Sequence, residues 1–339
     1  MKKKGIMAAA LLLAGMQLAL AAGAGDMAVN WLEDAITSGS LVSATMRYEH
    51  GAPTTPTPSP SPTVPSYTSA PMLSERTFAE TPEPSPTPEI KEATIYGELD
   101  IDNRTSFEIE PVSLMREGLT LSLPKEGPQI LIIHTHGTES YTAADGDNYV
   151  ESDYARTTNC DYNMIRVGNE LCAELEAQGL SVLHDRGLYD YPSYNGSYTR
   201  SGSAIESYLE KYPNIAIVID LHRDAIGDGD VVYKTMAEIP DVVSSQIMIL
   251  VGTGENGLSH PNWHENLKLA LMMQEAATSK YPTLMRPLAV RQERYNQQLT
   301  DGSLLIEVGS NGNTLREALT AVDLFADAVG PSLLELVSD

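Results

Sequence analysis

The chain has 339 residues, 42% of them hydrophobic, which suffices for one sizeable core without requiring a second globular domain. Its formal net charge of −24 would repel phosphate backbones and argues against nucleic-acid binding. The only two cysteines, Cys160 and Cys172, predict neither a disulfide framework nor a cysteine zinc site, so any zinc would need histidine and carboxylate ligands.

The N-terminus carries an export signal. Lysines at positions 2–4 precede an apolar stretch that runs to Gly25, an order that directs export with the N-terminus inside. This stretch is long enough to span a bilayer, yet Ala19-Leu20-Ala21 is an acceptable cleavage site, so residues 1–25 form either a signal anchor or a signal peptide. We expect the rest of the chain to be extracytoplasmic and anchored in the cell membrane by this one N-terminal helix, with a cleaved and secreted form as the alternative.

A tract rich in proline, threonine and serine follows from Ala52 to Pro88 and cannot bury enough apolar surface to fold. We therefore assign residues 26–92 to an extracytoplasmic stalk. Residues 93–127 are expected to be a lead-in segment, with short strands or a helix around 111–118. The folded domain is expected over residues 128–339.

Strands and helices alternate along that domain. We expect strands at 129–133, 180–183, 215–220, 245–251 and 303–308, and helices at 161–178, 203–211, 262–278 and 313–336. The alternation predicts an α/β fold with a single domain, in which a twisted, mostly parallel or mixed sheet has helices on both faces.

Three of the expected strands end in residues that can bind a metal ion or move a proton. These are His134, His136 and Glu139 after the first strand, Asp220, His222, Arg223 and Asp224 at the end of the third, and Glu307 in the last. The carboxyl ends of strands are where α/β folds place their sites, so we expect these side chains to lie together.

The spacing His136-x-x-Glu139, together with a distant His222, supplies three ligands of the kind that a catalytic zinc ion uses. Glu307, outside that set, would accept a proton from a water molecule whose pKa the metal lowers. The alternative for any one histidine is an ordinary core or surface residue. We keep that interpretation for His50, His184, His260 and His264.

Four stretches resemble the stage II sporulation protein P family. They are ILIIHTHGTESY at 130–141, VIDLHRDA at 218–225, GLSHPNWHENLKLAL at 257–271 and RYNQQLTDGSLLIEVGSNGNTLREA at 294–318. That family is in turn similar to the zinc-dependent N-acetylmuramoyl-L-alanine amidases. The resemblance puts the two amidase histidines on His136 and His222 and the amidase glutamate on Glu307.

The carboxylate ligand departs from the amidase pattern. Those amidases take it from the start of the following helix, where this chain has Asn159-Cys160-Asp161. We favour Glu139, because it shares a loop with His136, as the two ligands do in zinc carboxypeptidases. His134 is then expected to lie behind the ligands or to contact substrate, and an exchange of roles with His136 stays open.

The resemblance implies an exported peptidoglycan hydrolase of sporulation engulfment that cleaves the amide between N-acetylmuramic acid and L-alanine, with endopeptidase activity on cross-links also credited to the family. It implies Zn²⁺ as cofactor. The implied partners are sporulation protein D, a lytic transglycosylase, and sporulation protein M, a membrane protein. Arg223 is our candidate for the cation that offsets the oxyanion, the alternative being a salt bridge to Asp224 or Asp220.

Two other functions remain open at the level of sequence. One is a metallopeptidase acting on stem peptides, which would need a carboxylate clamp, and Arg286, Arg291 and Arg294 are available for it. The other is a non-catalytic peptidoglycan-binding scaffold of the engulfment complex.

Overall fold

The computed structural model describes residues 88–93, 100–227 and 230–338, all within the second of the two compact units of the chain, residues 52–339. The signal anchor or signal peptide expected over residues 1–25 and most of the expected stalk lie outside the described residues. Among the helices in the described ranges, none combines the length and apolarity that crossing a bilayer requires.

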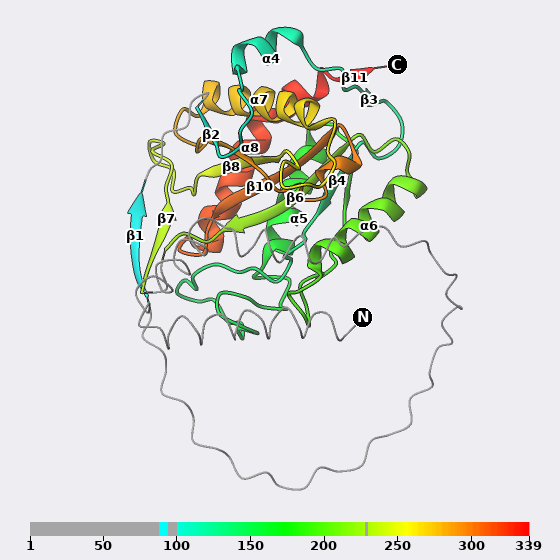
Figure 1. Cartoon of the computed structure of the whole chain (residues 1–339). Helices are drawn as coiled ribbons and strands as arrows, with labels where there is room; N and C mark the ends of the chain where they lie inside the picture. The colour runs from blue at the N-terminus through cyan, green and yellow to red at the C-terminus, as the bar shows by residue number, and fades with distance from the viewer. Residues whose placement is uncertain (1–87, 94–99, 228–229, 339) are drawn as a thin grey trace, which may run out of the picture. The chain divides into compact units, whose positions relative to one another are not determined.

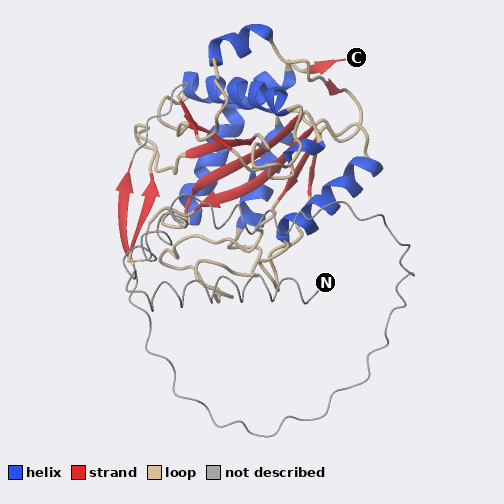
Figure 2. Ribbon diagram, viewed as in Figure 1, coloured by secondary structure: helices blue, strands red, loops and turns tan. Residues whose placement is uncertain are grey.

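A seven-stranded sheet forms the centre of the described fold, with helices packed around it (Figures 1 and 2). Its strand order is β2 (Ile101–Asn103), β9 (Leu288–Arg291), β8 (Ile247–Gly252), β10 (Gly302–Ser310), β6 (Ile217–Asp224), β4 (Ile130–Ile133) and β5 (Val182–His184). Neighbours run parallel except for β10 and β8, which are antiparallel. The sheet is therefore mixed and mostly parallel, as the alternating pattern predicts.

Alternation along the strands divides the core between the two faces of the sheet. Ile130 and Ile132 pack in the main core with residues of α5 (Met164–Ala177), α7 (Trp263–Lys280) and α8 (Leu315–Leu334). Leu131 and Ile133 point the other way and pack with Ile205 of α6 (Ser197–Lys211). Helices on both faces are thus confirmed, and the α6 face has fewer of them.

The helix ends follow local side-chain chemistry. Asn163 caps α5 by accepting a hydrogen bond from the backbone N–H of Ile165. Thr314 and Glu317 form a capping box at the start of α8. Helix α6 begins at Ser197, earlier than the expected start at residue 203, because burial of Tyr198 outweighs the weak helix propensity of the serine- and glycine-containing first turns.

The lead-in segment contributes to the same fold. Strand β2 forms one edge of the central sheet, α4 (Pro111–Glu117) packs against α7, and β3 (Leu123–Pro124) pairs with β11 (Val337–Ser338). Residues 89–93, at the end of the expected stalk, form β1 (Glu89–Ala93), which pairs with β7 (Val231–Thr235). A single turn, η1 (Gln297–Leu299), precedes β10.

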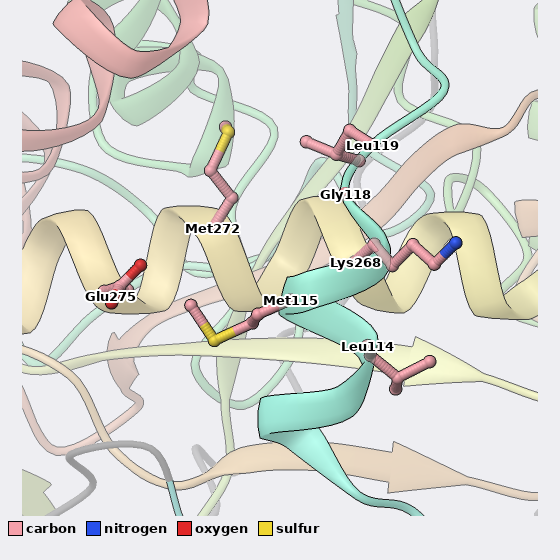
Figure 3. A pocket seen from close by; sticks show the side chains of 7 residues that line it. All are labelled: Leu114, Met115, Gly118, Leu119, Lys268, Met272 and Glu275. Atoms are coloured by element: carbon pink, nitrogen blue, oxygen red, sulfur yellow. The ribbon is translucent and has the colours of Figure 1, made fainter.

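A hollow lies where α4 crosses α7 (Figure 3). Its lining consists of Leu114, Met115, Gly118, Leu119, Lys268, Met272 and Glu275. Because none of the site residues expected from sequence lines it, the hollow is separate from the strand-end cluster.

Candidate metal centre

Two neighbouring strands place the acidic and histidine side chains on the same face of the sheet. On β6, Asp220 and His222 are two residues apart and therefore share a face with Val218, which packs towards α6. On β10, Glu307 stands opposite His222 in the parallel register. The cluster therefore lies on the α6 face, where the carboxyl end of β4 also delivers its loop.

That loop completes a three-residue cluster. The Nδ1 atom of His136 lies 3.6 Å from Oε1 of Glu139, and the Nδ1 atom of His222 lies 3.6 Å from Oε2 of the same carboxylate. All candidate ligand atoms lie within 4.8 Å of one another, and all three residues are buried. Tetrahedral zinc with bonds of about 2.1 Å separates its ligand atoms by about 3.4 Å, so the cluster fits zinc with little adjustment.

The far sides of both imidazoles are already engaged. Nε2 of His222 lies 2.8 Å from Oδ1 of Asp220, close enough for an ion pair. Oδ1 of Asp220 accepts a hydrogen bond from the backbone N–H of Thr135, and Oδ2 accepts one from the Thr135 hydroxyl. Nε2 of His136 lies 3.2 Å from the hydroxyl of Ser197. A partner on Nε2 orients each ring and leaves Nδ1 for a metal, as around catalytic zinc sites.

The protonation states of the three clustered side chains also suit binding of a metal cation. Burial lowers the pKa of His136 to about 3, so that imidazole is neutral and able to donate its lone pair. Burial opposes ionisation of Glu139, yet Arg223 and the two histidines outweigh it and hold the pKa of that carboxyl well below its usual range. His222 has a raised pKa, despite burial, because it stands between Asp220 and Glu139, where a metal ion would replace its proton.

Glu307 has the opposite character. Its Oε2 atom is buried without a hydrogen-bond partner among the described residues. Burial, followed by the nearby carboxylate of Asp224, raises the pKa of Glu307 to about 8, against the influence of His222. An unpartnered carboxyl beside a candidate metal ligand is suited to holding and releasing a proton.

His134 does not join the cluster. It is fully buried on the α5 face, where Nδ1 lies 2.8 Å from the carbonyl oxygen of Leu221 and Nε2 lies 2.8 Å from Nε2 of His184. A Cβ atom on Gly168 of α5 would come within 2.5 Å of both rings, so only glycine admits this pair. Asp161, the alternative carboxylate, is exposed and outside the cluster.

Arg223 is close to the cluster but committed to the backbone. Its guanidinium donates to the carbonyl oxygens of Ser140 at 2.8 Å, Ala155 at 2.9 Å and Asp224 at 3.3 Å. The side chain therefore connects the loop after β4 to the end of β6. Its positive charge helps to lower the pKa of Glu139.

Sequence reasoning missed three residues around the cluster. Arg156 lies 3.2 Å from Oε1 of Glu139 and 2.5 Å from the buried Asp190. The ring of Tyr194 stacks on His136 with centroids 4.5 Å apart, and Cζ of Arg156 lies 5.0 Å from that ring's centre. All three missed residues belong to loops without periodicity, so no sequence pattern could have placed them.

A sequence model of the stage II sporulation protein P family matches residues 67–330, more than half of the chain. Stage II sporulation protein P of Bacillus subtilis (strain 168) is 30% identical over 214 residues, which cover 58% of this chain and 49% of the relative. The chain thus spans about half the length of that curated relative. The family resemblance drawn from the sequence motifs is confirmed.

Three solved structures are also similar. AmiC2, an N-acetylmuramoyl-L-alanine amidase of Nostoc punctiforme, is 14% identical with a TM-score of 0.34, covering 62% of this chain and 97% of that chain. The CwlD amidase from Clostridioides difficile in complex with the GerS lipoprotein is 14% identical with a TM-score of 0.36, covering 61% and 98%. Ami1 from Mycobacterium smegmatis is 13% identical with a TM-score of 0.35, covering 61% and 96%. TM-scores of this size do not support a conclusion about activity.

Proposed function

The chain belongs to the stage II sporulation protein P family, and from this membership and its site we propose that it is a zinc-dependent peptidoglycan hydrolase. Its reaction is hydrolysis of the amide between N-acetylmuramic acid and L-alanine, which removes stem peptides from glycan strands. The observation that carries the proposal is the convergence of His136, Glu139 and His222. Glu307 stands beside them, and its Oε2 has no hydrogen-bond partner among the described residues.

His136, Glu139 and His222 would hold the zinc ion, which fits the distances and the ionised carboxylate described above. When bound, zinc supplies a Lewis acid that polarises the amide carbonyl, lowers the pKa of water and favours the ionised form of Glu307. Asp220 and Ser197 keep the two imidazole rings oriented throughout.

Proton movement falls to Glu307. The carboxylate takes a proton from the attacking water while the water oxygen bonds to the amide carbon. It then passes that proton to the leaving nitrogen as the carbon–nitrogen bond breaks. The products are a free carboxyl on the muramic acid lactyl group and a peptide with a free L-alanine amino terminus.

Location and partners are part of the same proposal. The lysines and apolar stretch of residues 1–25 support an extracytoplasmic protein anchored by one N-terminal helix. Family membership supports a role in engulfment alongside sporulation protein D and sporulation protein M.

The three arginines that could bind the terminal carboxylate of a peptide already contact other groups of the protein. Arg286 pairs with Asp224 at 2.7 Å, Arg291 with Asp102 at 2.6 Å, and Arg294 donates to the carbonyl oxygen of Ser259. These contacts favour an amidase over an enzyme that recognises a free peptide terminus.

Mass spectrometry of the fragments released from purified sacculi tests the proposal. The full-length protein is compared with zinc and with a chelator. We expect intact stem peptides with a free L-alanine amino terminus, lost on chelation. Release of only shortened or uncross-linked muropeptides would identify a peptidase instead. Sacculus binding without release, even with sporulation protein D added, would identify a scaffold.

A further inference from the structure

A second arginine beside the cluster is more exposed to solvent than the one that sequence suggested. Arg156 belongs to the loop between β4 and α5, and its Nη2 atom lies 3.2 Å from Oε1 of Glu139. Arg156 is partly exposed, whereas Arg223 is buried and donates to three carbonyl oxygens. Of the two cations beside Glu139, Arg156 is therefore the one that a substrate can reach.

The donors of Arg156 are only partly used. A guanidinium has five N–H groups. The structure pairs three of them, with Asp190 at 2.5 Å, Glu139 at 3.2 Å and the hydroxyl of Thr138 at 3.3 Å. The remaining N–H groups, on Nε and Nη2, have no acceptor among the residues that the structure describes. The Arg156 guanidinium, with two unpaired N–H groups in the described structure, therefore lies next to the candidate metal ligands.

The guanidinium is also held firmly. The carboxylate of Asp190 is fully buried and bonds to the hydroxyl of Thr138 as well as to Arg156. The ring of Tyr194 lies over the guanidinium at 5.0 Å and stacks on His136. Donors fixed before the substrate arrives require little reorganisation when charge develops, which is the condition for effective oxyanion stabilisation.

We propose that Arg156 binds the carbonyl oxygen of the scissile amide and stabilises the negative charge that develops there as water adds. This inference rests on the proposed amidase function and adds a catalytic residue to it. Arg156 donates hydrogen bonds only. The proton lost by water travels through Glu307 to the leaving nitrogen, and no electrons are transferred to or from the protein.

The competing interpretation is that Arg156 merely orients Glu139 as a ligand. The two interpretations differ in what a substitution changes. Loss of a positioning residue weakens zinc binding, whereas loss of an oxyanion donor lowers kcat and weakens the binding of a transition-state mimic while zinc affinity stays.

The experiment uses the full-length protein with Arg156→Lys and Arg156→Gln. Arg104→Gln is the matched control, because it removes the same charge from an exposed ion pair with Asp102, 3.4 Å away. Three quantities are measured for each variant. They are zinc affinity by competition with a chromophoric chelator, kcat and KM on a soluble muropeptide, and the affinity of a muramyl phosphinate that mimics the tetrahedral state.

We expect Arg156→Gln to lower kcat by about 10²- to 10³-fold, to weaken phosphinate binding by a similar factor, and to leave zinc affinity and KM within about threefold. The kcat and phosphinate affinity of Arg156→Lys should lie between those of the parent and of Arg156→Gln, since lysine keeps the charge but not the planar donors. Arg104→Gln should match the parent protein. Unchanged kcat, or zinc affinity that falls in step with kcat, would overturn the inference.

Removing Arg156 leaves Asp190 buried without its cation, which threatens folding. The double variant Arg156→Gln with Asp190→Asn removes both charges and should keep the fold while showing the same loss of phosphinate binding. If the parent protein binds no zinc or releases no peptide, the proposed function itself fails and this inference with it. If the parent is active and the double variant binds the phosphinate normally, only the role of Arg156 fails.

Discussion

Glu307 can be separated from the metal ligands by a single substitution. Glu307 stands opposite His222 in the register of β10 and β6, and its Oε2 has no hydrogen-bond partner among the described residues. Glu307→Gln therefore removes a proton carrier without removing a ligand. We expect the variant to bind one zinc ion per chain, as the parent should, and to lose about 10²- to 10⁴-fold in kcat. Elemental analysis and peptide release from sacculi measure the two effects. Loss of zinc would show that Glu307 is itself a ligand.

Asp220 offers a second test at this scale, because it contacts His222 and is expected to leave the metal ligands intact. Its carboxylate lies 2.8 Å from Nε2 of the histidine and is held by Thr135. Asp220→Asn keeps the shape but weakens the orientation and basicity of His222, so zinc affinity should fall by about 10- to 100-fold. Competition with a chelator measures it. An unchanged affinity would show that Asp220 does not support His222 as a ligand.

Three carboxylates meet between α5 and α8, and Arg166 pairs with one of them, Glu170. Ligand atoms of Glu170, Glu174 and Asp323 lie within 4.8 Å of one another, and Oδ1 of Asp323 has no hydrogen-bond partner in the described part of the chain. Burial, followed by repulsion from the two glutamates, raises the pKa of Asp323 from 3.8 to about 6. This seam of the two helices therefore contains electrostatic strain.

The sign of the effect on stability follows from that raised pKa. The folded protein holds the Asp323 proton more tightly than the unfolded chain does, so stability falls as pH rises from about 4 to about 6 and stays lowered above. We expect Asp323→Asn to raise the Tm at neutral pH, with the gain disappearing below about pH 4. Thermal unfolding at a series of pH values measures it.

Asp327, one turn further along α8, is the matched control. It accepts hydrogen bonds from Lys280 and Tyr281, which lower its pKa. Asp327→Asn should therefore leave the Tm at neutral pH unchanged or slightly lower, because exposed ion pairs contribute little. A rise in Tm for both variants would mean that the lower net negative charge stabilises the protein, and not the relief of repulsion among Glu170, Glu174 and Asp323.

The elements predicted from sequence are those with a long apolar signal. Buried runs such as Ile130–Ile133 and Ile217–Asp224 and the long helices show their own periodicity, so their existence and order could be predicted. Strands β2, β7 and β9 were missed. They are three to five residues long, and they are strands because a partner supplies hydrogen bonds, which a local pattern does not reveal.

The site was predictable to the same degree. Their positions at the ends of expected strands predicted His136, Glu139, His222 and Glu307 as site residues. In the structure the first three form one cluster, and Glu307 stands opposite His222. The choice between His134 and His136 depended on which face of the sheet each side chain takes beyond the strand end, and a loop conformation decides that. Arg156 comes from a loop packed against another loop, so only the tertiary structure reveals it.

Taken as a whole, the described fold includes the segment that sequence placed outside its folded domain. Leu123 is fully buried in the main core, and β2 covers the edge of β9, where Asp102 pairs with Arg291. Loss of one buried leucine side chain costs about 2–5 kcal/mol of unfolding free energy. Removing β2 also exposes the backbone of β9 as a free edge that invites association.

A chain truncated to start at Pro128 should therefore unfold at lower urea concentration than one that starts at Pro88, and should aggregate on concentration. Urea denaturation followed by circular dichroism and light scattering measure the two effects. Leu123→Ala in the longer chain separates the contribution of the core from that of the edge, because it leaves β2 paired with β9. If the shorter chain matched the longer one in stability and solubility, the folded domain would begin at residue 128, and the pairing of β2 with β9 would contribute nothing measurable.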